Sequence, residues 1–359
     1  MEQIKWHRTY VGEEEAARIR EALLNGCVSM GRVTEEFEGC LANSFKVPYC
    51  VVTPSGSVAI FMALKALEIG AGDEVIVPNR GWVAAAHAIH LAGAIVVLAD
   101  VRRDIPIIDV DDIRRVITPK TKAIIPLQLN GRSADMPELL KLAKSHHVAV
   151  VEDACQAMLS RNEGGMIGTQ GKMGCFSLGM AKLVATGQGG FVVTRDEGLF
   201  KALRSVRNHG VTDNFTDAWY RWGFNFKFTD IQAAMGIVQL ERAPQRIEHL
   251  KAIYDAYEKG LKSIPGVRLI PVKVPQGEVP LYIEVLADRR KELVQCLAER
   301  GIQARLATPD LNPTPYFKSE GEYPNSRIFS SRGLYLPGGP EQPLDNVQKV
   351  LRALEDFYS

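Results

Sequence analysis

The chain has 359 residues, of which 46% are hydrophobic and 24% are charged, and this size predicts one large globular domain joined to a smaller one. Its 43 basic and 42 acidic side chains leave a net charge of +1, which argues against a nucleic-acid-binding protein that relies on a broad basic face. No apolar run of about eighteen residues is present, so no membrane-spanning segment is expected. The N-terminal residues hold no apolar stretch behind a basic start, and we therefore expect no signal peptide.

The six cysteines share no spacing that would make a metal site or a CxxC redox pair. They occupy positions 27, 40, 50, 155, 175 and 296. Thiols in such a pattern are typical of a protein that folds in a reducing compartment. We therefore expect free cysteines and a cytoplasmic location.

Between residues 49 and 153, short apolar runs alternate with longer stretches of helical character. The candidate strands are residues 50–54, 74–78, 94–100, 121–127 and 147–153. Their apolar residues are continuous rather than alternating, which is typical of parallel strands covered on both faces. The candidate crossover helices between them are residues 55–72, 82–94 and 135–147. This repetition predicts an α/β fold with a large, mostly parallel, doubly wound sheet.

The second half of the chain begins with a candidate strand at residues 190–194 and a helix from about 196 to 207. A long amphipathic segment follows, and Thr229 or Asp230 is suited to cap it. Pro244 should break or kink that helix.

Beyond about residue 246 the predicted elements become shorter. The candidate strands are residues 267–272 and 281–286, and the candidate helices are residues 289–300 and 342–357. We therefore predict a large domain over residues 1–245, with an N-terminal helical segment, and a small C-terminal α/β domain over residues 246–359.

Three features fall where predicted strands end, which is where ligands bind in open α/β sheets. Gly56 and Ser57 open a helix, where backbone N–H groups favour a phosphate, although small-residue turns before helices are also common. Asp153 ends a buried strand and is interpreted as a helix cap, a magnesium ligand or a cofactor contact. Lys182 precedes a glycine cluster at 187–190 and, taken alone, is equally an ordinary solvated lysine.

Together these features match the needs of pyridoxal 5′-phosphate (PLP). That cofactor requires an anion site for its phosphate, a carboxylate beside its pyridine nitrogen and a lysine that binds its aldehyde as a Schiff base. We expect burial and the cofactor to lower the pKa of Lys182, because the amine must be unprotonated to attack.

Several longer stretches of the chain resemble one family. They are residues 29–38, 72–89, 131–157, 207–210 and 223–242. On these motifs the chain resembles the DegT/DnrJ/EryC1/StrS family of PLP-dependent sugar aminotransferases, and the resemblance implies the fold-type I transferase architecture.

The resemblance implies roles for individual residues. Lys182 matches the Schiff-base lysine, and Asp153 matches the partner of the pyridine nitrogen. Ser57 and Ser177 match phosphate-binding hydroxyls, and Gln156 matches a residue near the ring hydroxyl of the cofactor.

Two further residues, Trp82 and Asn225, complete the predicted site. Trp82 matches the position that stacks on the cofactor ring, with an ordinary core tryptophan as the alternative. Asn225 matches a phosphate ligand that the neighbouring subunit supplies in family dimers. It lies among aromatic residues in 221–228, so we expect a C2 homodimer with shared active sites.

The implied reaction is a ping-pong transfer from an amino acid, usually L-glutamate, to a keto-sugar, most often a nucleotide-linked 4-keto-6-deoxyhexose. The alternatives are a keto-cyclitol or non-nucleotide keto-sugar as acceptor, or a PLP-binding regulatory protein without turnover. The family's dehydratase branch has histidine in place of the lysine, so Lys182 argues against it. Residues 333–339 resemble perosamine-type members.

The chain also departs from the family pattern. Gln188 stands where the family has glutamate, and residues 309–317 lack the histidine of the C-terminal signature. We interpret both changes as affecting the choice of sugar rather than the cofactor chemistry.

Overall fold

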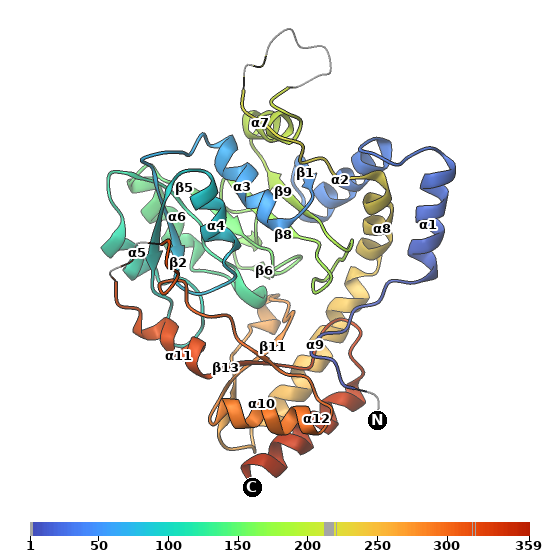
Figure 1. Ribbon diagram of the computed structural model, residues 1–359, viewed down its shortest axis with the longest axis vertical. Coiled ribbons are helices and arrows are strands. Elements are labelled where there is room, and N and C mark those ends of the chain that lie inside the picture. Colours follow the sequence, from blue (N-terminus) through green and yellow to red (C-terminus); the bar gives the residue numbers. More distant parts are fainter. Residues whose placement is uncertain (1–2, 212–218, 220, 318, 320) are drawn as a thin grey trace.

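A computed structural model describes residues 3–211, 219, 221–317, 319 and 321–359 of the chain. The large domain fills the upper part of Figure 1 and the small domain the lower part, where both termini lie. Within the described part of the chain, no helix is long and apolar enough to cross a membrane.

A seven-stranded sheet with the order β1-β9-β8-β5-β4-β2-β3 forms the centre of the large domain. Its strands are β1 Tyr49–Thr53, β2 Glu74–Pro78, β3 Ile95–Ala99, β4 Thr121–Ile124, β5 Ala149–Asp153, β8 Met173–Ser177 and β9 Gly190–Thr194. Only β9 runs antiparallel to its neighbours, β1 and β8. The predicted mostly parallel sheet is therefore confirmed; the prediction missed β8 as a strand.

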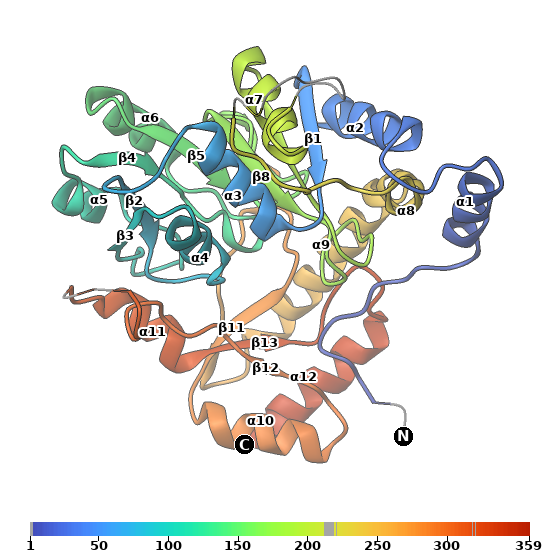
Figure 2. The same ribbon diagram turned by 45° about the horizontal axis from the view of Figure 1, so that its top comes forward.

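Helices cover both faces of this sheet, as the continuous apolar strands predict. One face packs against α3 Gly56–Ala66, α4 Ala84–Leu91 and α7 Glu197–Arg207. The other packs against α2 Arg32–Phe45, α5 Val110–Val116, α6 Met136–Ser145 and α8 Asp230–Glu241. Helix α1 Glu13–Leu24 lies against α8 at the outer edge, as Figures 1 and 2 show.

The two candidate caps of α8 have separate tasks. Thr229 caps the helix, and its Oγ1 accepts a hydrogen bond from the backbone N–H of Gln232. The Asp230 carboxylate instead accepts bonds from the N–H groups of Gly31 and Thr34, and so ties α2 to α8. Pro244 lies in the first turn of the next helix, α9 Ala243–Leu261, where a missing N–H costs nothing.

The small domain has a four-stranded antiparallel sheet with the order β10-β11-β13-β12. Its strands are β10 Val267–Leu269, β11 Ile283–Ala287, β12 Arg305–Leu306 and β13 Gly333–Leu336. Helices α10 Arg290–Glu299 and α12 Leu344–Tyr358 pack on it at predicted positions, whereas α11 Pro324–Arg332 and strands β12 and β13 were not predicted. Two short ribbon strands, β6 Arg161–Asn162 and β7 Gly165–Met166, complete the strands described.

Helix α9 joins the two domains. Its Leu250 packs in the core of the large domain, whereas Ile253 and Tyr257 pack in that of the small domain. The division between residues 245 and 246 stays a prediction, since this helix runs continuously through it.

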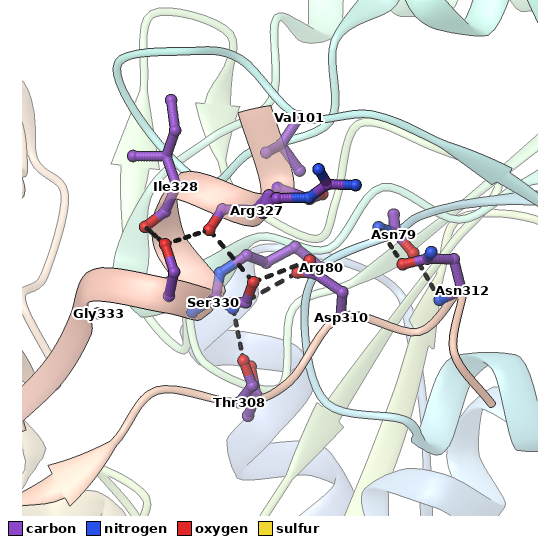
Figure 3. Close-up of polar contacts among 12 residues, drawn as sticks. Asn79, Arg80, Val101, Thr308, Asp310, Asn312, Arg327, Ile328, Ser330 and Gly333 are labelled. Carbon is purple, nitrogen blue, oxygen red and sulfur yellow. Dashed lines mark hydrogen bonds and ion pairs between the residues drawn. The ribbon is translucent and has the colours of Figure 1, made fainter. Parts of the chain in front are cut away.

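After β12 the chain returns to the large domain. The Asn79 side chain bonds to Asn312, and the buried Arg80 guanidinium donates to the Thr308 carbonyl at 2.5 Å. Figure 3 shows Arg80 reaching from the loop after β2 toward Thr308 and Asp310. We call residues 305–312 the return segment; it closes one side of the candidate site.

Candidate active site

A cavity of about 410 Å³ lies at the carboxyl ends of the parallel strands. Of the eight predicted site residues, seven line it: Gly56, Ser57, Trp82, Asp153, Gln156, Ser177 and Lys182. They come from five separate stretches of sequence, and the sheet brings them together because parallel strands end at one edge. Their assigned roles remain proposals.

Lys182 lies in the loop that connects β8 to β9. Its Nζ donates a hydrogen bond to the Tyr282 hydroxyl at 3.3 Å. Burial alone lowers the pKa of Lys182. The Tyr282 phenol, the Cys155 thiol and the Asp153 carboxylate outweigh burial and raise that pKa above its ordinary value. The expected decrease is therefore wrong for the protein by itself, because these neighbours favour the ammonium form.

Asp153 is the last residue of β5 and is buried. Its Oδ1 accepts a hydrogen bond from the N–H of Cys155, and residues 154–160 form turns, so Asp153 does not cap a helix. Burial raises the pKa of Asp153, although the bonds from Cys155 and the charge of Lys182 act in the opposite direction. A cationic group in the cavity would stabilise the ionised carboxylate.

The neighbouring Glu152 makes a useful contrast, because successive residues of a strand point to opposite faces. Its carboxylate accepts four hydrogen bonds, from the N–H groups of Gly168, Gln170 and Gly171 and from the Gln128 amide. Glu152 is therefore satisfied by the protein, whereas Asp153 faces the cavity.

The N-terminus of α3 also lines the cavity. Ser55 caps the helix by accepting from Val58 N–H, and none of the described residues accepts from the N–H groups of Gly56 or Ser57. The cavity also receives the hydroxyl-bearing side chains of Ser57 and Ser177. Free N–H groups at a helix start together with hydroxyls suit a phosphate.

Two glycines in or beside the site, Gly56 and Gly190, have packing reasons that sequence reasoning did not identify. A Cβ atom on Gly56 would lie 2.8 Å from Cys155 Sγ and 2.9 Å from Ser177 Cβ, so close protein packing requires glycine there. A Cβ atom on Gly190 would lie 2.5 Å from the Ser55 carbonyl. Gly187 has a φ of 77°, a left-handed conformation that lets the lysine loop turn.

Trp82 and Gln156 line the cavity from two further loops. Trp82 is 62% exposed in the single chain, which excludes the alternative of an ordinary core tryptophan. The Gln156 side chain accepts a hydrogen bond from the N–H of Asn130 at 3.1 Å, so its position is fixed.

Asn225 is the predicted site residue that does not line the cavity. It forms an isolated bridge with Asn208, and it is exposed. The nearby Trp222 and Phe224 are 51% and 58% exposed. Within the single chain, Asn225 therefore does not contribute to the cavity.

Sequence reasoning missed the wall that faces the strand ends. Its residues are Trp6, Tyr282, Arg305, Leu306, Thr308 and Tyr335. The Arg305 guanidinium lies 4.2 Å from the Trp6 ring centroid, which is a cation–π contact. No local motif marks these residues, since each lies in or beside a strand of the small domain or in the N-terminal segment and gains its role only when the small domain packs against the large one.

The functional groups that line the cavity fit PLP. A lysine amine, a buried carboxylate and a helix start with two serine hydroxyls surround one cavity, as the aldehyde, ring nitrogen and phosphate of that cofactor require. With a mostly parallel sheet and a small antiparallel domain, they define a fold-type I PLP-dependent transferase.

The chain matches the DegT/DnrJ/EryC1/StrS aminotransferase family over residues 9–355, and it belongs to that family. The protein is therefore an enzyme, an aminotransferase whose cofactor is PLP. The sequence-based recognition of the family, the fold and the cofactor is confirmed.

Three similar proteins place the chain within the family. It is 32% identical over 338 residues to GDP-perosamine synthase of Escherichia coli O157:H7, covering 92% of each chain. It is 29% identical over 373 residues to dTDP-4-dehydro-2,3,6-trideoxy-D-glucose 4-aminotransferase of Saccharopolyspora spinosa, covering 99% of this chain and 96% of that one. The crystal structure of S. venezuelae DesV in complex with a ketimine intermediate superposes with a TM-score of 0.91 at 32% identity, covering 96% and 94%.

Proposed function

We propose that the enzyme transfers an amino group from L-glutamate to a nucleotide-linked 4-keto-6-deoxyhexose by a ping-pong mechanism. The observation that carries the proposal is the convergence of Lys182, Asp153 and the start of α3 on one cavity, in a chain of this family. Two relatives whose names state a nucleotide-linked sugar support the acceptor class.

When bound, PLP supplies an aldehyde that receives the amino group and a protonated ring that withdraws electrons. Asp153 holds the proton on the ring nitrogen, because a buried carboxylate strongly favours a cationic partner. The Nζ of Lys182 removes the proton from the substrate carbon and returns it, acting as a general base and then a general acid.

The remaining predicted residues position the cofactor. The N–H groups at the start of α3 and the hydroxyls of Ser57 and Ser177 bind the phosphate. Trp82, which lines the cavity, would stack on the ring when the cofactor is bound. Gln156 contacts the ring hydroxyl.

The enzyme acts as a C2 homodimer in which Asn225 reaches the phosphate end of the partner's cavity. Support comes from the exposed Asn225 and from Trp222 and Phe224, whose rings are half or more exposed in the single chain. Mixing Lys182→Ala with Asn225→Ala subunits should restore activity, because one of the two shared sites then has neither substitution. No recovery after proven subunit exchange, or a monomer at working concentration, would contradict the shared site.

The cytoplasm is the location that suits this enzyme. All six cysteines are free in the structure, as expected in a reducing compartment. Fractionation of the producing cell, with the protein detected by antibody, tests this location.

The acceptor is tested by loading the protein with the amine form of the cofactor and offering a panel of keto-sugars. The panel contains nucleotide-linked 4-keto-6-deoxyhexoses, a keto-cyclitol and keto-sugars without a nucleotide, with product mass and NMR as readout. Formation of 2-oxoglutarate from glutamate is measured in parallel. Transfer to the keto-cyclitol or to a free keto-sugar alone would overturn the proposal.

A further inference from the structure

Tyr282 brings the small domain into direct contact with the candidate cofactor lysine. It precedes β11, lies 100 residues from Lys182 in sequence and is 8% exposed. Its hydroxyl lies 3.3 Å from Lys182 Nζ, and its ring lines the cavity. No sequence motif pointed to this residue.

The hydrogen bonds of the Tyr282 phenol make it a donor to the backbone and an acceptor toward Lys182. Its O–H donates to the Ala181 carbonyl at 2.9 Å, so the proton of the phenol is committed to the backbone beside Lys182. The oxygen lone pairs then accept from Lys182 Nζ. A phenol held in this way presents a fixed acceptor to the amine.

Asn130 holds Tyr282 in place. Its side-chain Oδ1 accepts from Tyr282 N–H at 2.7 Å, and its Nδ2 donates to the Tyr282 carbonyl at 3.0 Å. Asn130 is 1% exposed and has a φ of 56°, a left-handed conformation that asparagine tolerates better than most residues. Its own N–H donates to Gln156 Oε1, so one residue fixes two sides of the cavity.

We infer that Tyr282 is a further active-site residue whose phenol oxygen holds the Lys182 amine whenever that amine is not bonded to the cofactor, and that Asn130 is the positioning residue for Tyr282. The inference rests on the role proposed for Lys182. By keeping the released amine beside the reacting carbon, the contact reduces the orientations that Lys182 samples before proton transfer.

The first test uses the protein free of PLP, so that it does not depend on activity. Acetic anhydride acetylates only unprotonated amines, and peptide mass spectrometry follows Lys182 against pH, with surface lysines of the same digest as internal references. Besides Tyr282, the charged or titratable groups that face Lys182 are Asp153, Cys155 and His7. None of these three residues is substituted in the test.

In Tyr282→Phe, Lys182 should label faster near neutral pH, on the order of tenfold, because the lost hydrogen bond to the charged amine no longer favours the ammonium form. The midpoint of the pH profile should decrease, whereas the limiting rate at high pH, which reports access, should change little. In the loaded enzyme, conversion by glutamate should slow with little change in the glutamate KM.

Tyr257→Phe is the matched control, because it removes a buried phenol that bonds to the Pro337 carbonyl outside the cavity. It should leave the Lys182 profile unchanged. Asn130→Gly keeps the left-handed backbone and the N–H to Gln156 but removes both bonds to Tyr282, and should move the midpoint in the same direction by a smaller amount.

The inference would be overturned if the pH profile of Lys182 labelling had the same midpoint in folded Tyr282→Phe as in the unaltered protein. This would hold even if the variant were less stable. Borohydride reduction of the loaded protein identifies the cofactor lysine separately. A label on another lysine would contradict the role of Lys182, whereas the labelling midpoint judges the contact with Tyr282.

Discussion

The two walls of the cavity differ in how the chain builds them. The first wall is built at the strand ends of one sheet: Asp153 and Ser177 are the last residues of β5 and β8, Gly56 opens α3, and Lys182 lies in the loop after β8. The second wall consists of Trp6, Tyr282 and the return segment, which come from the small domain and the N-terminal segment. The backbone geometry of the sheet therefore positions the residues of the first wall, whereas side-chain hydrogen bonds between the domains position those of the second wall.

Because the two walls are built differently, substitutions in them should have different effects. Substitutions in the first wall should remove chemistry or close packing at a stable scaffold. Substitutions in the second wall should change the contacts between the two domains and the dependence of the protein on pH. The following predictions test that division, from the largest expected effect to the smallest.

Lys182→Ala should abolish both the yellow colour of the PLP-loaded enzyme and amino transfer, because no other described residue of the cavity carries an aliphatic amine. The absorption spectrum and glutamate turnover check this. Borohydride reduction and peptide mapping of the unaltered enzyme should label Lys182, and a label on a different lysine would contradict the assignment.

Asp153→Asn should lower turnover by orders of magnitude while the fold remains stable. Asparagine keeps the acceptor for Cys155 N–H, so the free energy of unfolding should change by about 1 kcal/mol or less. Stopped-flow half-reactions with glutamate and urea unfolding measure the two quantities.

Glu152→Gln supplies the comparison on the opposite face of the same strand, since it perturbs a carboxylate with four donors and should reduce stability instead. Near-normal half-reaction rates in stable Asp153→Asn would remove the catalytic role of Asp153.

Gly56→Ala should destabilise the protein by about 1–3 kcal/mol and weaken PLP binding, because the new Cβ would lie 2.8 Å from Cys155 Sγ. Urea unfolding and a PLP titration give the two effects. Gly39→Ala is the control, since nothing lies within 4 Å of a Cβ there and alanine in a helix stabilises by about 0.5–1 kcal/mol. Equal stability changes in both variants would show that the packing at Gly56 has no cost.

His7, in the second wall's N-terminal segment, should make stability depend on pH. Burial, then the charges of Lys182 and Arg305, lower the pKa of His7 to about 3. Between about pH 6.5 and 3 the unfolded chain binds more protons there, so stability should fall as the pH falls, by at most about 1.4 kcal/mol per pH unit.

Urea unfolding at pH 7, 6 and 5 measures this slope, and His7→Gln should flatten it because glutamine does not titrate. His146→Gln, at an exposed histidine, is the matched control for replacing a histidine by glutamine. The same slope in the His7 variant and the unaltered protein would exclude His7 as its source.

The sequence by itself determined the parallel sheet, the family, the cofactor and the residues of the first wall. These features are local, because a continuous apolar run marks a buried strand and the residue after it lies at the sheet edge. The start of α7 near residue 196 was likewise readable from a few neighbouring residues, whereas the choice between Thr229 and Asp230 as the cap of α8 needed the structure.

Only the tertiary structure decided the second wall and the electrostatics of the lysine. Tyr282 reaches Lys182 across 100 residues of sequence, and Asn130 reaches Tyr282 across 152. The raised pKa of Lys182 depends on the distances to Tyr282, Cys155 and Asp153, which no local pattern contains. Side-chain hydrogen bonds require contact between donor and acceptor, and charge interactions depend on the distance between the groups, so both become defined only when the domains are packed.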